Sequence, residues 1–317
     1  MSRWMTCLRH ATSLLVLVTF AVVLQPLQAQ TAEQIAILRW YPANTGLSFA
    51  VAAGPYGIAF DGANMWVAGY TGSTLTKVRA NDGAVLNTIT IPQGAYGLAF
   101  DGGNIWVAGY SSNVVTKVRA SDAVILGTFA AGNGVYGLAF DGSNIWVTNS
   151  SDNTVSKLRA SDGANLGTYP VGIFPTFLAF DGANMWVSSY SVNTVSKLRA
   201  SDGANLGNFS ISNPEGLVFD GSNIWVANFT ANSITKMRAS DGAILGTYRA
   251  GTQPFGVVFD GANIWVAALA SNFVSKIRAS DGASLGRYPA QSGPFCLAFD
   301  GANVWATNLY SASVSKL

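Results

Sequence analysis

The sequence predicts an all-β protein: a seven-bladed β-propeller with four antiparallel strands in each blade. An Asp-Gly pair with a Trp five residues after the Asp occurs seven times, and the copies are 40 residues apart at every step but one, which is 39. Each copy contains four short apolar runs separated by turn residues, as a propeller blade does. The repeated tryptophans are Trp66, Trp106, Trp146, Trp186, Trp225, Trp265 and Trp305.

In the first copy the four runs are residues 57–60, 64–68, 75–79 and 85–90. Asp61-Gly62 joins the inner pair and Asp82-Gly83 the outer pair, which indicates tight hairpins because Gly accepts positive φ without steric cost. The two inner runs are apolar on both faces, and successive side chains of a strand point to opposite faces. Both faces must therefore be covered, so we expect each Trp to pack as a wedge between neighbouring blades.

The seventh copy ends at Leu317 without a fourth run. Residues 47–51, Leu-Ser-Phe-Ala-Val, align with the fourth run of the other copies. We therefore expect them to complete the last blade and close the ring, which would remove an exposed sheet edge. The predicted propeller spans residues 45–317, after a lead-in segment at residues 30–44.

Residues 1–29 have the pattern of a secretory signal. Arg3 and Arg9 supply the positive region, residues 11–24 form an apolar core too short for a confident membrane span, and Leu-Gln-Ala at 27–29 is a plausible cleavage site. The sequence therefore predicts an extracytoplasmic protein, periplasmic or secreted, that begins at Gln30 and has no membrane span after cleavage.

The charge balance argues against nucleic acid as a partner. The chain has 18 Lys+Arg and 16 Asp+Glu, and cleavage after residue 29 would remove Arg3 and Arg9 and leave 16 of each. Nucleic-acid binding favours a basic face. The only His, His10, would be lost with the signal, and Cys296 would be the one remaining Cys. We expect a buried free thiol and a monomer.

The repeat resembles a known group of bacterial propellers. Pro-Tyr-Gly-Ile-Ala-Phe-Asp-Gly at 55–62, Ile-Trp-Val-Thr-Asn at 145–149 and Asn-Thr-Val-Ser-Lys-Leu at 153–158 resemble the YVTN-type repeat. NHL and virginiamycin B lyase-like (streptogramin lyase) propellers are similar. The resemblance implies seven blades and an extracytoplasmic or surface role.

The lyase resemblance also implies a histidine-dependent, magnesium-assisted site on one face. The mature chain has no His onto which that chemistry can be carried. A virginiamycin B lyase-like or lactonase-like metal-dependent enzyme is therefore the disfavoured alternative, and the sequence predicts no catalytic residue, no metal site and no cofactor.

Comparison of the seven copies separates architecture from candidate function. Thirteen of the 16 acidic residues are repeated turn aspartates, and all seven lysines occupy one repeated position. We expect these charges to form turns or to lie solvated at the rim, and Asp61 to lie close enough to Arg79 to pair with it. Positions that differ between copies are the candidates for binding.

Two variable positions lie at the end of the blades opposite to the Asp-Gly turns. We expect aromatic and polar side chains there to surround the mouth of the central channel, as a small-molecule or peptide site requires. The alternative is packing over the core. The candidate ligand-binding residues are Tyr56, Tyr96, Tyr136, Thr176, Glu215, Phe255 and Phe295 at the first position, and Tyr70, Tyr110 and Tyr190 at the second.

Glu215 is the one acid in the first of these rings, and it follows a shortened loop. Its carboxylate would favour a cationic or amine-bearing ligand, although a single carboxylate is a weak metal site. The alternative is that Glu215 merely replaces a Tyr and points to solvent. The functional prediction is a non-enzymatic binding scaffold for a protein, peptide or glycan on the loop face, with a purely structural surface module as a further alternative.

Overall fold

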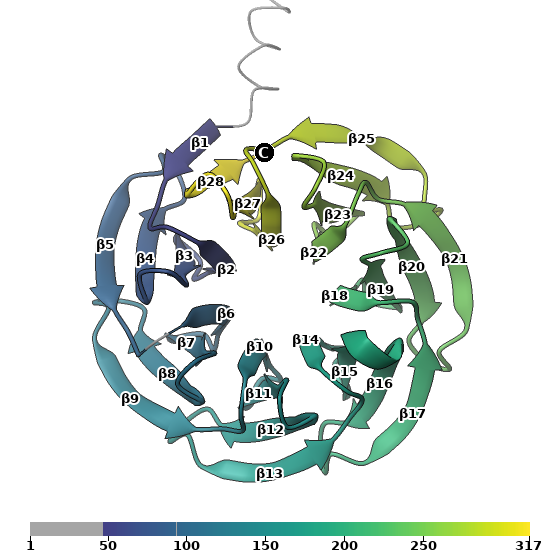
Figure 1. Ribbon diagram of the computed structural model, residues 1–317, viewed down its shortest axis with the longest axis horizontal. Coiled ribbons are helices and arrows are strands. Elements are labelled where there is room, and N and C mark those ends of the chain that lie inside the picture. The colour runs from purple at the N-terminus through teal and green to yellow at the C-terminus, as the bar shows by residue number, and fades with distance from the viewer. Residues whose placement is uncertain (1–46, 93) are drawn as a thin grey trace, which may run out of the picture. The chain divides into compact units, whose positions relative to one another are not determined.

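The computed structural model describes residues 47–92 and 94–317, which form seven four-stranded antiparallel sheets around a central channel (Figure 1). The predicted seven-bladed propeller is confirmed. The signal at residues 1–29 and the lead-in at 30–44 lie outside the described residues. Within residues 47–92 and 94–317, no helix has the length and apolarity needed to cross a membrane.

In each blade the strands follow one another from the channel to the rim. The innermost strands are β2 (Pro55–Phe60), β6 (Ala95–Phe100), β10 (Val135–Phe140), β14 (Pro175–Phe180), β18 (Pro214–Phe219), β22 (Pro254–Phe259) and β26 (Pro294–Phe299). The second strands are β3 (Asn64–Gly69), β7 (Asn104–Gly109), β11 (Asn144–Asn149), β15 (Asn184–Ser189), β19 (Asn223–Asn228), β23 (Asn263–Ala268) and β27 (Val304–Asn308).

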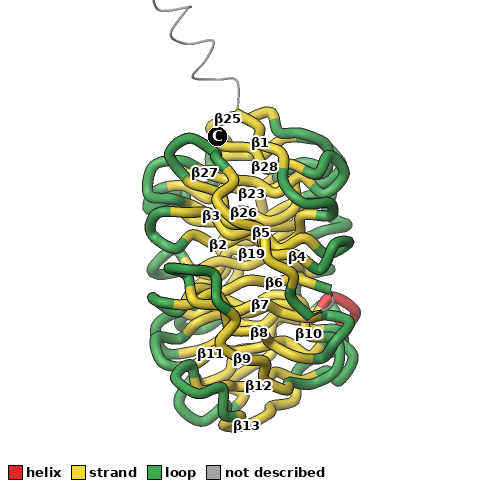
Figure 2. The backbone as a smooth tube through the Cα atoms, turned by 90° about the vertical axis from the view of Figure 1, so that its left-hand side faces the viewer, coloured by secondary structure: helices red, strands yellow, loops and turns green. Residues whose placement is uncertain are grey.

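The third strands are β4 (Thr74–Arg79), β8 (Val114–Arg119), β12 (Thr154–Arg159), β16 (Thr194–Arg199), β20 (Ser233–Arg238), β24 (Phe273–Arg278) and β28 (Ser313–Lys316). The outer strands are β5 (Val85–Thr90), β9 (Ile125–Ala130), β13 (Asn165–Pro170), β17 (Asn205–Ser210), β21 (Ile244–Arg249), β25 (Ser284–Pro289) and β1 (Leu47–Ala50). A single 3-10 turn, η1 (Tyr190–Val192), follows β15. Figure 2 shows the ring from the side, with the connecting loops gathered at its two faces.

The N-terminal strand closes the ring, as the sequence predicts. β1 pairs antiparallel with β28, from Leu47 opposite Lys316 to Ala50 opposite Ser313 (Figure 1). The backbone N–H of Val51 extends this pairing by donating to the carbonyl of Ala312 at 3.0 Å. Blade 7 therefore joins the two ends of the described chain in one sheet.

The repeated Trp is an inter-blade wedge, and its polar atom is satisfied within its own blade. Trp66 is fully buried and packs against Ile105 and Val118 of the next blade. Its indole N–H donates to Asp61 at 2.7 Å, and the other Asp61 oxygen accepts the backbone N–H groups of Ala63 and Asn64. The same Trp–Asp bond occurs in all seven blades. Each Asp thus both shapes the tight turn and pairs a buried donor.

The repeated Lys is also an inter-blade contact, so the expectation of a solvated rim is wrong for this residue. The ammonium group of Lys77 lies 5.1 Å from the centre of the Trp66 ring and donates to the Ala120 carbonyl of the next blade at 2.6 Å. In four blades the Lys is less than a tenth exposed. The apolar stem of the Lys covers the indole ring, while its charged end reaches a carbonyl group of the next blade. The spacing of Lys and Trp in the sequence does not reveal this contact.

The expected ion pair between Asp61 and Arg79 is also wrong. Asp61 is occupied by Trp66 and its own turn, whereas Arg79 pairs with Asp82 of the outer hairpin at 2.9 Å. Both Arg79 and Asp82 are about half exposed, so solvent screens the pair and it adds little to stability.

Glycine on the innermost strands lets neighbouring blades approach closely. The pairing of β2 with β3 is interrupted between Pro55 and Ile58, and Gly57 lies in that interruption. A Cβ atom added to Gly57 would lie 2.1 Å from the backbone oxygen of Tyr96 in the next blade. Gly97, Gly137, Gly216 and Gly256 make the same approach. The corresponding residues of blades 4 and 7 are Phe177 and Cys296.

Candidate functional site

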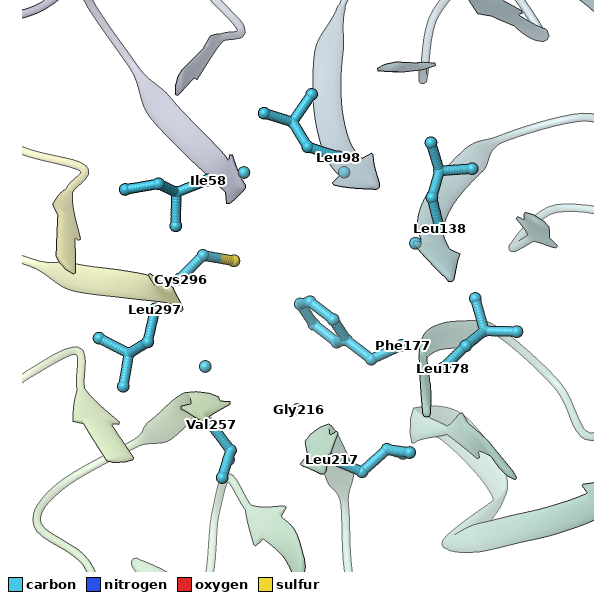
Figure 3. Close-up of a pocket in the computed structure, with 14 residues that line it drawn as sticks. Ile58, Leu98, Leu138, Phe177, Leu178, Gly216, Leu217, Val257, Cys296 and Leu297 are labelled. Carbon is cyan, nitrogen blue, oxygen red and sulfur yellow. The ribbon is translucent and has the colours of Figure 1, made fainter. Parts of the chain in front are cut away.

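A cavity of about 160 Å³ occupies the central channel. Its wall consists of the glycines of the innermost strands, the aliphatic residues that follow them, and the two replacements Phe177 and Cys296. Both replacement side chains point into the cavity, whereas the aliphatic side chains point away from its centre (Figure 3). The wall is therefore apolar apart from backbone groups and the Cys296 thiol.

An aromatic plug closes one end of this channel. We define it as the six residues whose rings contact one another around the axis: Tyr56, Tyr96, Tyr136, Phe177, Phe255 and Phe295. The distances between successive ring centres are 4.4, 4.2, 5.6, 5.4, 3.9 and 4.9 Å, and the last of these joins Phe295 back to Tyr56. The hydroxyl of Tyr96 donates to that of Tyr136 at 2.6 Å. The plug is thus a closed ring of packed side chains.

The sequence comparison did not identify Phe177, although it is part of the plug. Blade 4 has Thr176 where three other blades have Tyr, and its aromatic residue comes one position later. The Phe177 ring fills the gap that Thr176 and Glu215 leave between Tyr136 and Phe255. The sequence does contain an indication of this role, because Phe177 and Cys296 are the two residues that replace the glycine found on the innermost strand of the other five blades.

Glu215 is enclosed in the channel rather than exposed at its mouth. Its side chain is 6% exposed, so the alternative that it points to solvent is wrong. The Thr176 hydroxyl hydrogen-bonds the carboxyl group, while Oε2 is buried with no partner among the described residues. Burial raises the pKa of Glu215 to about 8, and the hydrogen bond from Thr176 opposes this only in part. Burial therefore favours the neutral, protonated form of this carboxyl group near pH 7.

Cys296 lies close enough to Glu215 to respond to its charge. Burial, and secondarily the Glu215 carboxylate, raise the pKa of the thiol to about 12. Nucleophilic chemistry requires the thiolate, so this thiol is held in its unreactive form near neutral pH. Cys296 is free, as predicted, but it is only partly buried, because its side chain lines the channel cavity.

Tyr70, Tyr110 and Tyr190 form a second layer at the same end of the channel. The ring of Tyr70 lies 5.4 Å from Tyr56 and 6.2 Å from Tyr96, and the ring of Tyr110 lies 5.9 Å from Tyr96. Tyr190 begins η1 and contacts Phe229 at 6.2 Å. All three tyrosines are partly exposed, whereas three of the six plug residues, Tyr136, Phe255 and Phe295, are buried.

The structure thus places the ten candidate residues at one end of the channel, in two layers. Seven belong to the enclosed inner layer: Tyr56, Tyr96, Tyr136, Thr176, Glu215, Phe255 and Phe295. Within this layer Thr176, Glu215, Tyr136, Phe255 and Phe295 are buried, and Tyr56 and Tyr96 are partly exposed. Tyr70, Tyr110 and Tyr190 form the outer layer and are all partly exposed. A ligand that meets this face contacts the outer layer first.

The donor set at this end does not fit a lyase-type metal site. A divalent hard cation takes several oxygen ligands, usually including more than one carboxylate. Glu215 is the only carboxyl group of the inner layer, and its neighbours are Thr176, aromatic rings and the Cys296 thiol. Within residues 47–92 and 94–317, no cluster of three or more His, Cys, Asp or Glu is arranged to hold a metal ion.

Solved structures of other proteins share this architecture, and three of them illustrate it. A virginiamycin B lyase from Staphylococcus aureus matches with a TM-score of 0.74 and 19% identity, over 86% of this chain and 98% of that chain. A structure described as a streptogramin B lyase matches with a TM-score of 0.74 and 19% identity, over 86% and 96%. Hydrazine synthase of Kuenenia stuttgartiensis matches with a TM-score of 0.75 and 17% identity, over 84% and 96%.

Comparisons of the sequence alone identify no relative of this chain among characterised proteins. No protein-family model matches the chain, and a comparison with curated proteins finds no significant relative. At these identities, the structural matches describe the fold and not the activity. The chain has the fold of the virginiamycin B lyase-like seven-bladed propellers.

Proposed function

We propose that this protein is an extracytoplasmic binding scaffold that takes a protein or peptide segment on the face carrying Tyr70, Tyr110 and Tyr190. The observation that carries the proposal is the position of Tyr70 and Tyr110. Each is partly exposed, and each rests on the rings of the aromatic plug. Because the rings beneath restrict their movement, binding costs little additional side-chain entropy.

The composition of the surrounding loops supports a protein or peptide ligand. The loops between the second and third strands read Tyr-Thr-Gly-Ser at 70–73, Tyr-Ser-Ser-Asn at 110–113 and Tyr-Ser-Val-Asn at 190–193. Antibody binding loops are enriched in the same residue types, because Tyr supplies rigid contact area and Ser, Gly and Asn supply adaptable hydrogen bonds. Ile173, Val192 and Tyr310, in or beside these loops and those that enter the inner strands, are exposed apolar side chains.

An extracytoplasmic location is part of the same proposal. It rests on the positive region, apolar core and cleavage pattern of residues 1–29 and on the near-neutral balance of the remaining chain. Fractionation of a producing cell, with N-terminal sequencing of the protein, tests it. We expect the protein outside the cytoplasm with Gln30 as its first residue.

Selection of peptides from a random display library tests the binding face. We expect peptides that bind the wild-type protein and lose at least about 10-fold in affinity to Tyr70→Ala and Tyr110→Ala, since truncating an aromatic anchor costs on the order of 2 kcal/mol. Leu126→Ala and Leu166→Ala serve as matched controls, because these leucines are exposed on the outer strands β9 and β13.

Three results would contradict the proposal. The first is peptides whose affinity is unchanged in both tyrosine variants. The second is binding on a glycan array with no peptide binding, which would assign the face to carbohydrate. The third is magnesium-dependent turnover of a streptogramin B, the reaction class suggested by the names of two structural matches, which would make the protein an enzyme.

A further inference from the structure

Two arginines of the propeller stand apart from its repeated charge pattern. Six arginines, at the ends of β4, β8, β12, β16, β20 and β24, each pair with an Asp three residues later. The seven lysines are all placed over the Trp wedges. Arg249 and Arg287 belong to neither set. Both are exposed, and within residues 47–92 and 94–317 no carboxylate lies within ion-pair distance of either.

Both arginines line the same groove, which has a volume of about 190 Å³. Arg249 is the last residue of β21, the outer strand of blade 5, and Arg287 lies in β25, the outer strand of blade 6. These two strands follow each other around the rim (Figure 1). The groove adjoins the loop after β21 and the loop after β23, so it lies at the edge of the face that carries the tyrosines.

One arginine of the groove is stacked on an aromatic ring. The guanidinium of Arg287 lies 4.7 Å from the centre of the Phe273 ring, a stacking contact that limits its rotation. Gly251, with φ of 95°, has its backbone against the same ring, and an added Cβ atom would lie 2.9 Å from it. Phe273 and Gly251 thus form a compact apolar support beneath the charged group.

The remaining lining residues offer hydrogen-bond donors. The Thr252 backbone N–H donates to the Ser271 hydroxyl at 2.9 Å, and the Gln253 backbone N–H donates to the Asn232 side-chain oxygen at 2.9 Å. These bonds hold the loop after β21 and orient the Asn232 side chain. The Asn232 NH2 group donates to no described residue. No Asp or Glu lines the groove within the described part of the chain.

A second groove of the same propeller shows that the fold does not require these arginines. Between blades 3 and 4, the equivalent groove is lined by Pro170, Gly172, Thr194 and Asn208. Pro170 occupies the position of Arg249, Asn208 that of Arg287, and Thr194 that of Phe273, as their places in the strands show. The charged groove therefore differs from its counterpart at both arginine positions and at the aromatic residue that supports Arg287.

We propose that the groove between blades 5 and 6 binds an oxoanion through Arg249 and Arg287. The planar guanidinium presents paired N–H donors that match the oxygens of carboxylate, phosphate and sulfate groups. Two such groups without carboxylate neighbours create a local positive potential, and the Asn232 amide NH2 and the Thr252 hydroxyl add neutral donors. The inference does not depend on the proposed peptide-binding function, although an acidic group on a bound partner would reach this edge of the same face.

Isothermal titration at low ionic strength tests the proposal with four probes: inorganic phosphate, sulfate, acetate and glucuronate. We expect saturable binding of at least one probe, weakened by added salt because the arginines are exposed. Arg249→Gln and Arg287→Gln should each reduce the affinity by about 10-fold, the lower end of the range for a charged hydrogen-bond partner. Binding of phosphate and sulfate, but not of acetate and glucuronate, would indicate a natural ligand with a phosphate or sulfate ester. Binding of acetate and glucuronate alone would indicate a ligand with a carboxylate.

Two control variants make the test specific. Arg238→Gln removes a paired framework arginine and should leave the affinity within about 2-fold of wild type. The triple change Pro170→Arg, Thr194→Phe, Asn208→Arg rebuilds the arginines and their aromatic support in the second groove and should add a second binding event. Binding of none of the four probes, or equal loss in Arg238→Gln and the groove variants, would overturn the proposal. Unchanged melting temperatures of Arg249→Gln and Arg287→Gln establish that both variants are folded.

Discussion

Replacing Glu215 by Gln should change how the stability of the protein depends on pH. The folded protein encloses this carboxyl group, and its pKa rises from an ordinary value of 4.5 to about 8. The unfolded chain exposes the group to water, where its pKa is ordinary. Between pH 4.5 and 8 the folded state therefore holds one proton more than the unfolded state, so the free energy of unfolding falls as the pH rises through this window.

The magnitude follows from the difference between the two pKa values. Each pKa unit corresponds to about 1.4 kcal/mol, so the stabilisation that is fully present below pH 4.5 falls by about 5 kcal/mol by pH 8. The steepest slope is about 1.4 kcal/mol per pH unit. Glu215→Gln carries a neutral group of similar shape at every pH and should show no such loss.

Urea unfolding between pH 5 and 9 measures this difference. Few other groups interfere, because the described residues contain no His and the repeated Asp residues titrate at lower pH. We expect the wild-type free energy of unfolding to fall with pH, that of Glu215→Gln to stay level, and the variant to be the more stable protein at pH 9.

Asp152→Asn is the matched control, because Asp152 is the other described acid outside the repeated turns and is fully exposed. This variant should keep the wild-type slope. A wild-type protein whose stability is level from pH 5 to 8 would refute the reasoning, since it would mean that the Glu215 carboxylate is fully solvated or paired in the folded state.

Three further predictions follow from the packing. Trp146→Ala should lower the free energy of unfolding by about 3–5 kcal/mol. Asp141→Asn keeps the acceptor of the turn but places an NH2 group against the buried indole N–H, so it should cost about 1–3 kcal/mol, and a cost above that of Trp146→Ala in chemical denaturation would contradict the wedge. Removing residues up to 53 should lower the melting temperature and promote self-association through the edge of β28, and a monomeric truncation of unchanged stability would contradict closure. Cys296 should resist alkylation at pH 8 until urea unfolds the chain, and rapid labelling of the folded protein would show that its thiol is not held protonated.

The blade number and the ring closure could be predicted because they depend on features that a sequence records directly. The 40-residue period counts the blades, and the alignment of residues 47–51 with the missing fourth run identifies the closing strand. The inter-blade position of Trp66 follows from strands that are apolar on both faces. Each of these inferences concerns one blade or the order of blades along the chain.

The contacts between blades were harder to predict. Lys77 alternates with apolar residues in the way of a surface strand, and its contact with the neighbouring blade arises only because that blade supplies the Ala120 carbonyl. Residues in the channel pose the same difficulty. Tyr56, Tyr136 and Phe295 come from three different blades, and whether their rings surround an opening or fill it depends on the distance between inner strands. Sequence spacing within one copy carries no information about that distance.

The distance between inner strands is set by the glycines that face the neighbouring backbone. A single methyl group at Gly57 would meet the Tyr96 oxygen at 2.1 Å, and four other blades have the same restriction. Alanine at these positions would push the inner strands apart and lengthen the circumference of the ring. A longer circumference separates the rings of the plug and suits a larger number of blades. These small residues therefore let five of the seven blades pack closely enough for the aromatic rings at the axis to touch one another.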